Sequence, residues 1–394
     1  MKTTANLLIL IAIVTLANPS LATTTLRVNC DRGKTIESAL RRARAGHTIR
    51  VRGVCQETVT ITTDGLTLDG QGSAIIAGQG ADAVTVDGAH RVTIKGFEIR
   101  EGRNGLIIKG GASAMLHDTV VKENTSSGIL IDGNSSLDIM NSVTETNGLF
   151  GISIDRASEL RISGEFNARR NGVFGMIFGN NSSGTFTEAQ IRVNDNILGI
   201  QVGINSSVLI ADAATMVDTS NNLTTGFTVV AGSTLFVFEG HIESNSNRLN
   251  HGVSANSNSN IDLDRGGSIT VGNNGQDGIQ LENSALNLFN MPGLRGSAVE
   301  TRNNGRHGLS AFLESQIDLS IDSVVTSQGN TMAGLRADNG SAIRVINSQI
   351  TNNNPDAELS FAARAELNGN TIGTITCDGS VLIRGDVGVT CPAP

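Results

Sequence analysis

The sequence of 394 residues has no tryptophan and no tyrosine, and aromatic residues make up only 3% of it. A large core centred on aromatic side chains is therefore excluded, because those rings supply much of the buried area in such cores. Charged residues are also scarce, at 17%, and the formal net charge is −8. That sign argues against nucleic acid as a partner, since binding to phosphates requires a basic surface.

Apolar runs long enough to cross a membrane are missing. One run, Leu7–Ala17, follows Lys2 and precedes the small residue Ala22. This order is typical of a secretory signal, and the run is shorter than the roughly 20 residues of a membrane span. We therefore predict a signal peptide over residues 1–22, and a protein exported to the periplasm or the cell exterior with no membrane span after its removal.

Cysteines are few, with only four in the chain. Cys30 and Cys55 lie near the start of the predicted exported chain, and Cys377 and Cys391 lie near its end. Two separate pairs in an exported protein predict two local disulfides, and four free buried thiols are the alternative. Neither pair has the spacing of a zinc site.

Glycine, by contrast, is abundant, with 46 residues. A glycine-apolar-x-apolar pattern recurs ten times, 23 to 30 residues apart, beginning at Gly105, Gly128, Gly151, Gly175, Gly199, Gly226, Gly252, Gly278, Gly308 and Gly334. One turn of a β-solenoid needs about this many residues, and period-2 alternation marks half-buried strands. The sequence therefore predicts a single all-β parallel solenoid of about 11–13 turns over residues 23–394, and a monomer.

Two polar columns accompany the glycines. Seven residues after the glycine lie Ser135, Ser158, Ser182, Ser206, Ser233, Ser259, Ser315 and Ser341. Four residues before it lie Asn124, Asn147, Asn171, Asn222, Asn274, Asn304 and Asn330, and Asn354 continues the series. Stacked Asn side chains can pass hydrogen bonds along the solenoid and pair turn backbone. We expect structural ladders here, with each glycine allowing a sharp bend of the chain.

A solenoid needs capped ends, because open strand edges aggregate. Residues 35–45 predict an amphipathic helix with Ile36, Ala39, Leu40 and Ala43 on one face. We expect residues 23–62 to form an N-terminal cap containing this helix, and residues 372–394 to form a C-terminal cap.

The chain resembles the right-handed parallel β-helix proteins of the pectin lyase-like superfamily. The resemblance rests on Thr35-Ile36, Ala39-Leu40, the stretch Leu66–Gly70 and the ten repeated turns, and it covers roughly residues 26 to 391. It implies a right-handed parallel β-helix fold. The superfamily includes lyases, hydrolases, epimerases, metal-delivery proteins and inert fibres, so fold does not determine function. The polygalacturonase motif set and the Asp-Pro-His motif of alginate epimerases are absent, which argues against a standard uronan-cleaving activity.

Titratable residues precede the repeat glycines on three consecutive turns. His251, Asp277 and His307 each precede a repeat glycine on consecutive turns, so they should stack at steps of about 5 Å. An imidazole beside a carboxylate can act as a general base, and we predict these three residues to be catalytic. Two histidines and a carboxylate could instead hold a divalent metal. The predicted substrate-binding residues around them are Arg306, Arg336, Gln280, Ser254 and Ser310.

Acidic residues gather elsewhere as well. Asp262, Asp264, Asp318 and Asp322 share a face, where a solvated surface is expected and a weak calcium site is the alternative. We predict no cofactor, with calcium or another divalent metal as the alternative. The predicted function is binding or modification of an acidic polysaccharide along the sheet face of the C-terminal half, by a lyase, hydrolase or epimerase if the protein is an enzyme. The alternatives are a non-catalytic structural or adhesive β-helix, and metal handling.

Overall fold

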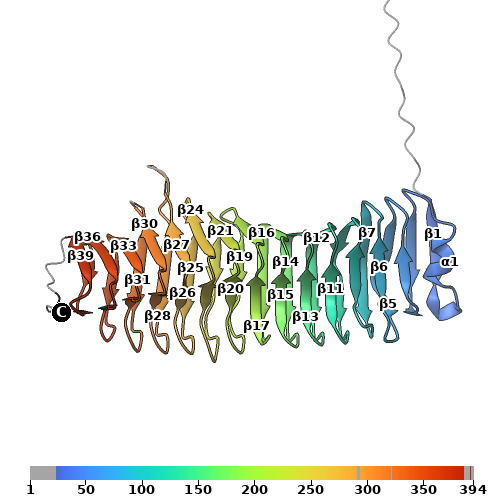
Figure 1. The fold of residues 1–394 in the computed structure, drawn as a ribbon. Coiled ribbons are helices and arrows are strands. Elements are labelled where there is room, and N and C mark those ends of the chain that lie inside the picture. The colour runs from blue at the N-terminus through green and yellow to red at the C-terminus, as the bar shows by residue number, and fades with distance from the viewer. Residues whose placement is uncertain (1–23, 291–292, 321, 386–390, 392–394) are drawn as a thin grey trace, which may run out of the picture.

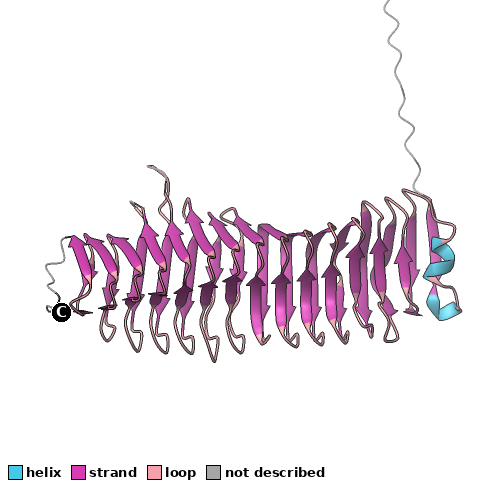
Figure 2. Ribbon diagram, viewed as in Figure 1, coloured by secondary structure: helices cyan, strands magenta, loops and turns pink. Residues whose placement is uncertain are grey.

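The protein is an elongated β-solenoid, seen from the side in Figure 1. The structure is a computed structural model that describes residues 24–290, 293–320, 322–385 and 391. The predicted signal peptide, residues 1–22, lies outside the described residues. Figure 2 shows that strands make up nearly all of the regular structure, with helix only at the N-terminal end. The predicted all-β parallel solenoid is confirmed.

One face of the solenoid is a 14-stranded parallel sheet, which we call the glycine sheet because ten of its strands begin at or beside a repeat glycine. Its strands are β4 (Val59–Ile61), β6 (Val84–Asp87), β8 (Leu106–Lys109), β11 (Ser127–Ile131), β13 (Phe150–Ile154), β15 (Phe174–Phe178), β17 (Leu198–Val202), β20 (Phe227–Val230), β23 (Val253–Asn256), β26 (Ile279–Glu282), β29 (Leu309–Phe312), β32 (Leu335–Ala337), β35 (Ala357–Leu359) and β38 (Ile375–Cys377).

The other strands form a bent 25-stranded parallel sheet, which we call the long sheet. Its strands in the N-terminal half are β1 (Thr25–Asn29), β2 (Thr48–Arg52), β3 (Val54–Gln56), β5 (Thr67–Ala77), β7 (Val92–Arg100), β9 (Ser113–His117), β10 (Val120–Lys122), β12 (Ser136–Glu145), β14 (Glu159–Arg169), β16 (Ser183–Asn194), β18 (Ser207–Ala211) and β19 (Met216–Asp218). Those in the C-terminal half are β21 (Thr234–Phe238), β22 (His241–Glu243), β24 (Asn260–Asp264), β25 (Ser268–Gly272), β27 (Ala285–Leu288), β28 (Ala298–Arg302), β30 (Gln316–Leu319), β31 (Val324–Gln328), β33 (Ala342–Ile346), β34 (Gln349–Thr351), β36 (Arg364–Asn368), β37 (Thr371–Ile372) and β39 (Leu382–Gly385).

The solenoid has about 14 turns, slightly more than the 11–13 expected, since the glycine sheet has 14 strands. Ten turns carry the repeated glycine, and the other four are those of β4, β6, β35 and β38. Inside, alternate residues of every turn stack into a continuous core of Ile, Leu and Val with a few Phe, among them the fully buried Phe166 and Phe186. Burial of this apolar surface is the main stabilising contribution to the fold.

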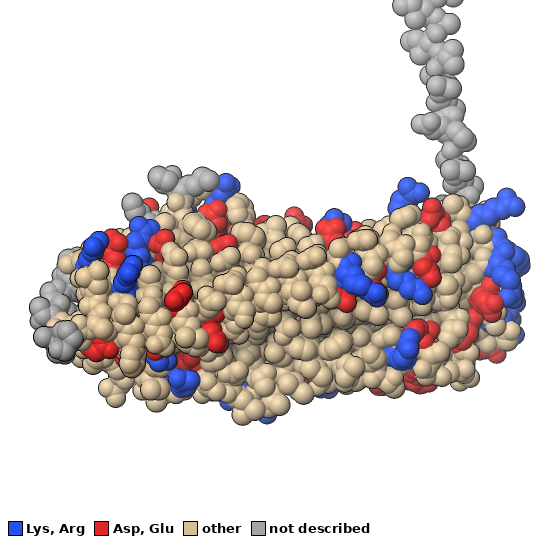
Figure 3. All heavy atoms as spheres, in the orientation of Figure 1, with Lys and Arg blue, Asp and Glu red and all other residues tan. Residues whose placement is uncertain are grey.

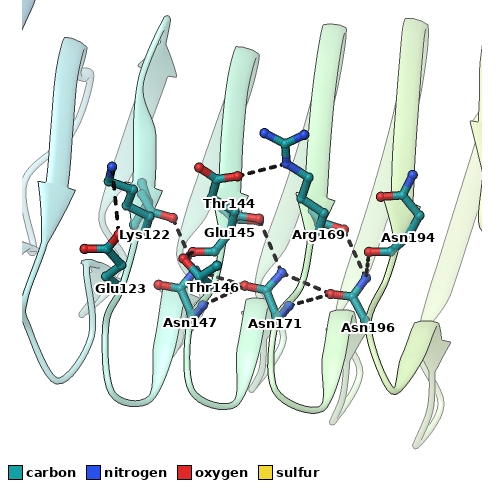
Figure 4. Close-up of polar contacts among 12 residues, drawn as sticks. Lys122, Glu123, Thr144, Glu145, Thr146, Asn147, Arg169, Asn171, Asn194 and Asn196 are labelled. Atoms are coloured by element: carbon teal, nitrogen blue, oxygen red, sulfur yellow. Dashed lines mark hydrogen bonds and ion pairs between the residues drawn. The ribbon is translucent and has the colours of Figure 1, made fainter. Parts of the chain in front are cut away.

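An asparagine ladder runs through the turn that precedes the glycine sheet (Figure 4). Asn147 Nδ2 donates to Asn171 Oδ1 at 3.0 Å, and Asn171 Nδ2 donates to Asn196 Oδ1 at 3.2 Å. Each side-chain oxygen also accepts the backbone N–H of the asparagine on the preceding turn, so the turn backbone is paired. The ladder comprises Asn124, Asn147, Asn171, Asn196, Asn222, Asn247, Asn274, Asn304, Asn330 and Asn353.

The prediction was wrong for the last member, because Asn353 and not Asn354 accepts from Asn330, at 2.9 Å. The serine column is likewise a ladder, and it gains Ser284 between Ser259 and Ser315.

The explanation predicted for the repeat glycines was also wrong. Gly128 and its equivalents do not adopt the left-handed conformation. A Cβ atom on Gly128 would lie 2.6 Å from Asn147 Nδ2 and 2.8 Å from the carbonyl oxygen of Gly151. The glycine is therefore required for space beside the asparagine ladder rather than for a bend.

The N-terminal helix is shorter than predicted. Helix α1 spans Ile36–Leu40, whereas residues 35–45 were expected, and the chain continues from Arg41 as a turn. Thr35 caps α1 by accepting from the N–H of Ser38, and Ile36 and Ala39 are buried against the first turn. Disulfides join Cys30 to Cys55 and Cys377 to Cys391. Among the described residues, no helix has the length and apolar character needed to cross a bilayer.

Candidate functional site

The His-Asp-His column lies just before strands β23, β26 and β29 of the glycine sheet. Because each residue precedes the repeat glycine and the strands pair in register, the three side chains meet on consecutive turns. His251 Nδ1 lies 3.5 Å from Asp277 Oδ2, and Arg306 Nε lies 4.0 Å from Asp277 Oδ1. The structure therefore brings together the three residues that were predicted to be catalytic and one of the predicted arginines.

The column also pairs backbone groups. His251 Nδ1 accepts the backbone N–H of Asp277 at 3.3 Å, and Asp277 Oδ1 accepts the backbone N–H of His307 at 3.0 Å. A nitrogen that accepts an N–H carries no proton, so this contact places the proton of His251 on Nε2. The contact of 3.5 Å between His251 Nδ1 and Asp277 Oδ2 is therefore not an ion pair.

Burial controls the charge of all three residues. His251, Asp277 and His307 are only 5%, 2% and 1% exposed. Burial lowers the pKa of His251 to about 4, and Arg306 adds to this effect. Burial likewise lowers the pKa of His307 to about 4, with Arg336 and Arg306 adding to it. Burial raises the pKa of Asp277, and the His307 N–H and the two arginines offset part of that rise. Both imidazoles are therefore neutral at pH 7.

The remaining predicted binding residues form the adjacent column. Ser254, Gln280, Ser310 and Arg336 are direct neighbours on β23, β26, β29 and β32. The Ser254 hydroxyl donates to Thr228 Oγ1 at 3.2 Å, and the guanidinium of Arg336 bonds to Asp338. Asp338, which follows the end of β32, was not predicted from the sequence, although its position two residues after Arg336 was a usable signal.

Four buried polar atoms in this region have no hydrogen-bond partner among the described residues. They are His307 Nδ1, Ser310 Oγ, Arg336 Nε and Asp338 Oδ1. Unpaired buried polar atoms are rare in folded proteins because each costs about 1–3 kcal/mol. The cluster therefore holds unused hydrogen-bonding capacity, although its atoms are buried.

A metal does not suit the column. Among the described residues, the one group that brings three potential ligand atoms within 4.8 Å of each other is Cys30, Cys55 and Glu57. The two sulfur atoms of that group form a disulfide and are not available as thiolates. His251, Asp277 and His307 do not meet this distance criterion.

A surface pocket lies on the other face of the C-terminal half. It has a volume of about 680 Å³ and lies over β30, β33, β36 and β39 of the long sheet. Its charged side chains are Asp318, Arg344, Arg364, Glu366 and Arg384. Arg344 Nε donates to Asp318 Oδ1 at 2.6 Å, whereas Arg364 and Arg384 have no ion-pair partner among the described residues.

Of the residues that line this pocket, Asp318 alone was named from the sequence. The positions Gln316, Ala342, Arg364 and Leu382 are direct neighbours, yet they are 26, 22 and 18 residues apart. Because the last turns become shorter, a search of the sequence with a fixed repeat length does not align these four positions. Pairs of exposed Arg residues near the C-terminus were the available signal.

Comparisons with known proteins support the fold. The family described as "Right handed beta helix region" matches residues 49–168. The A-module of the mannuronan C-5 epimerase AlgE6 from Azotobacter vinelandii is 16% identical, with a TM-score of 0.51 over 73% of this chain and 84% of that one. No curated protein matches the chain. The protein therefore has a right-handed parallel β-helix fold.

Two further solved structures are more distant. A mutant form of the periplasmic alginate epimerase AlgG is 13% identical, covers 91% of this chain and 82% of its own, and has a TM-score of 0.43. Pectate lyase Pel9A is also 13% identical, covers 78% of this chain and 80% of its own, and has a TM-score of 0.35. These two superpose too loosely to support any conclusion.

Proposed function

We propose that the protein is exported and binds an acidic polysaccharide on its C-terminal half. The observation that supports this most directly is the pocket on the long sheet, where Arg364 and Arg384 have no carboxylate partner among the described residues. Arginine binds carboxylates through two parallel hydrogen bonds, so these side chains suit a uronate group. The similarity to an epimerase of mannuronan, and the two disulfides, agree with an exported protein that meets such a polymer.

The finer proposal is that the His-Asp-His column modifies the bound polymer. His307, whose Nδ1 has no hydrogen-bond partner among the described residues, would accept a proton from the carbon next to a uronate carboxylate, and Arg306 and Arg336 would bind that carboxylate. Two features oppose rapid catalysis. A pKa of about 4 makes each imidazole a weak base, and the column is almost completely buried. A substrate would have to open the surface over these turns before reaching them.

A non-catalytic role is the second candidate, and one observation favours it. The side chains of the column pair the backbone of adjacent turns, as the asparagine and serine ladders do. If the column serves only this purpose, the protein is a structural or adhesive β-helix. The catalytic candidates then contribute to stability and not to activity.

Binding is tested on an array of acidic and neutral glycans, with polyuronates followed by calorimetry. The variant Arg364→Gln/Arg384→Gln should lose at least tenfold in affinity for polyuronate. The matched control Arg170→Gln/Arg192→Gln removes the same charge from two exposed positions, one just after strand β14 and one on strand β16, and should change affinity less than twofold. Equal losses in both variants would mean that binding depends on overall charge, and no binding to any acidic glycan would refute the proposal.

Modification is tested separately, by depolymerisation and by epimer analysis of the same polyuronates. His251→Ala/His307→Ala should abolish any activity of the wild-type protein while binding persists. Activity that survives in this variant would remove the column from the mechanism. Binding without any product in the wild-type protein would favour the structural or adhesive role.

A further inference from the structure

The N-terminal end of the solenoid is strongly basic, although the whole chain has a net charge of −8. Residues 24–56 contain eight Lys and Arg but only two acidic residues, Asp31 and Glu37. The eight cations are Arg27, Arg32, Lys34, Arg41, Arg42, Arg44, Arg50 and Arg52. Figure 3 shows many blue side chains at this end, with some red ones among them. The opposite charge of the body makes the end a distinct electrostatic region.

Four of these cations surround one hollow. Arg27, Lys34, Arg50 and Arg52 line a surface pocket of about 170 Å³, together with Asn29 and Gln71. The sheet register explains their convergence, because Arg27 pairs with Arg50 on adjacent strands and Asn29 pairs with Arg52. Its volume is well above the 15 Å³ or so that a single water molecule needs.

The positive charge of the pocket is poorly balanced within the protein. Arg50 Nε lies 3.8 Å from Asp69 Oδ2, and that carboxylate is shared with Lys95 at 3.9 Å. Arg52 reaches only the neutral Gln71, at 3.5 Å. Arg27 and Lys34 have no ion-pair partner among the described residues. Stacked guanidinium groups on neighbouring strands about 5 Å apart repel each other by about 1 kcal/mol even in water.

We propose that this pocket is an oxyanion-binding site, which takes a phosphate, a sulfate or the carboxylate of an acidic polysaccharide. A bound oxyanion removes the repulsion between Arg27 and Arg50, and it accepts hydrogen bonds from several guanidinium and ammonium groups at once. Charge on the terminal strand β1 also protects that edge from aggregation. Protection of the edge explains charged residues on β1. It does not explain why Lys34, which lies outside the strand, lines the same pocket as the three arginines.

The site is independent of the proposed binding of polysaccharide to the C-terminal half, because inorganic anions test it alone. Sulfate and phosphate are titrated into the purified protein by calorimetry, at constant ionic strength maintained with chloride. Saturable binding is expected, with a rise in melting temperature. Arg27→Gln/Lys34→Gln should weaken it at least tenfold. The control Arg32→Gln/Arg44→Gln removes the same charge from the same end outside the pocket and should weaken it less than threefold.

A second titration identifies the source of the anion. If polyuronate binds and sulfate displaces it from this end, the pocket takes a carboxylate from a polysaccharide. If sulfate or phosphate binds but polyuronate does not compete, the pocket takes the free ion. An effect that chloride reproduces at equal ionic strength, or an equal loss in the control variant, would overturn the proposal. So would the absence of binding by all three anions.

Discussion

The same arrangement of residues occurs at two places in the solenoid with opposite electrostatic results. Near the N-terminus, Asp82 faces Arg103 and Asn104 on the next turn; near the C-terminus, Asp277 faces Arg306 and His307. In both, the carboxylate accepts the backbone N–H of the residue before the glycine. Burial alone would raise the pKa of Asp82, but hydrogen bonds from Arg103 and Asn104 lower it. The pKa of Asp277 is raised.

Burial is the main cause of this difference, since Asp277 is 2% exposed and the Asp82 side chain is 23% exposed, and the contacts of the neighbouring arginine also differ. Arg103 binds Asp82 through Nε at 3.0 Å and through Nη2 at 2.7 Å, and the residue before Asp82 is an alanine. The residue before Asp277 is Gln276, and its Oε1 accepts from Arg306 Nη1 at 3.3 Å. Arg306 is thereby shared with Gln276, and its Nε stays 4.0 Å from the buried carboxylate of Asp277. The pKa of an aspartate at this position of the repeat thus depends on its burial and on neighbouring side chains that are not part of the repeat.

The largest expected difference between the two regions is their response to acid. His251 and His307 have a pKa of about 4 in the folded protein against 6.5 when exposed. Their contribution to stability is complete above pH 6.5 and is lost as the pH falls toward 4, because the unfolded chain then binds more protons. Between pH 7.5 and pH 4.5, each imidazole should lower the free energy of unfolding by about 2–3 kcal/mol.

The raised pKa of Asp277 has the opposite sign, since its stabilising effect is lost as pH rises, and it offsets part of this slope. Urea unfolding at pH 7.5 and 4.5 measures the total. The variant His251→Asn/His307→Asn, which introduces the residue found at Asn104, should lose several kcal/mol less than the wild-type protein. Parallel losses in both proteins would show that the imidazoles are not buried.

The next largest effect is expected from removing each carboxylate. Asp277→Ala leaves the buried His307 N–H without its acceptor and should lower the free energy of unfolding by about 2–3 kcal/mol. Asp82→Ala removes a more exposed group, 23% exposed at its side chain, and should cost about 1 kcal/mol or less. Urea unfolding at pH 7 compares them. Asp277→Asn, which keeps an acceptor and removes the charge, should recover most of the stability; if it does not, the carboxylate charge itself is needed.

The smallest effect tests the cause of the difference. Gln276→Ala should release Arg306 to bind Asp277 and lower the pKa of that carboxyl group. The reciprocal change Ala81→Gln should draw Arg103 away and raise the pKa of Asp82. Each should change stability by less than about 1 kcal/mol. Carboxyl pKa values from NMR titration report both directly, and an unchanged Asp277 in Gln276→Ala would assign its raised pKa to burial alone.

The sequence was sufficient to predict the solenoid, its two polar ladders and the meeting of His251, Asp277 and His307, because stacking repeats a simple pattern. It was insufficient where the turn length varies. Asn196 and Asn247 were missed because they lie three and five residues before their repeat glycines rather than four, and Asn353 was displaced by one position beside Pro355. Burial of the column could not be predicted either, since it depends on how side chains of neighbouring turns pack around it.

The asparagine ladder has a further consequence for the length of the molecule. Its hydrogen bonds run in one direction, from each turn to the next, and they end where Asp356 Oδ1 accepts the backbone N–H of Asn353 at 2.8 Å. Each interior asparagine of the ladder contacts an asparagine on both adjacent turns. Interior turns are therefore equivalent to each other, whereas the first and last turns are not. A whole turn could be excised or duplicated with both caps retained, and each such change would alter the length by one strand spacing, about 4.8 Å. The length of the solenoid is therefore set by the number of its turns.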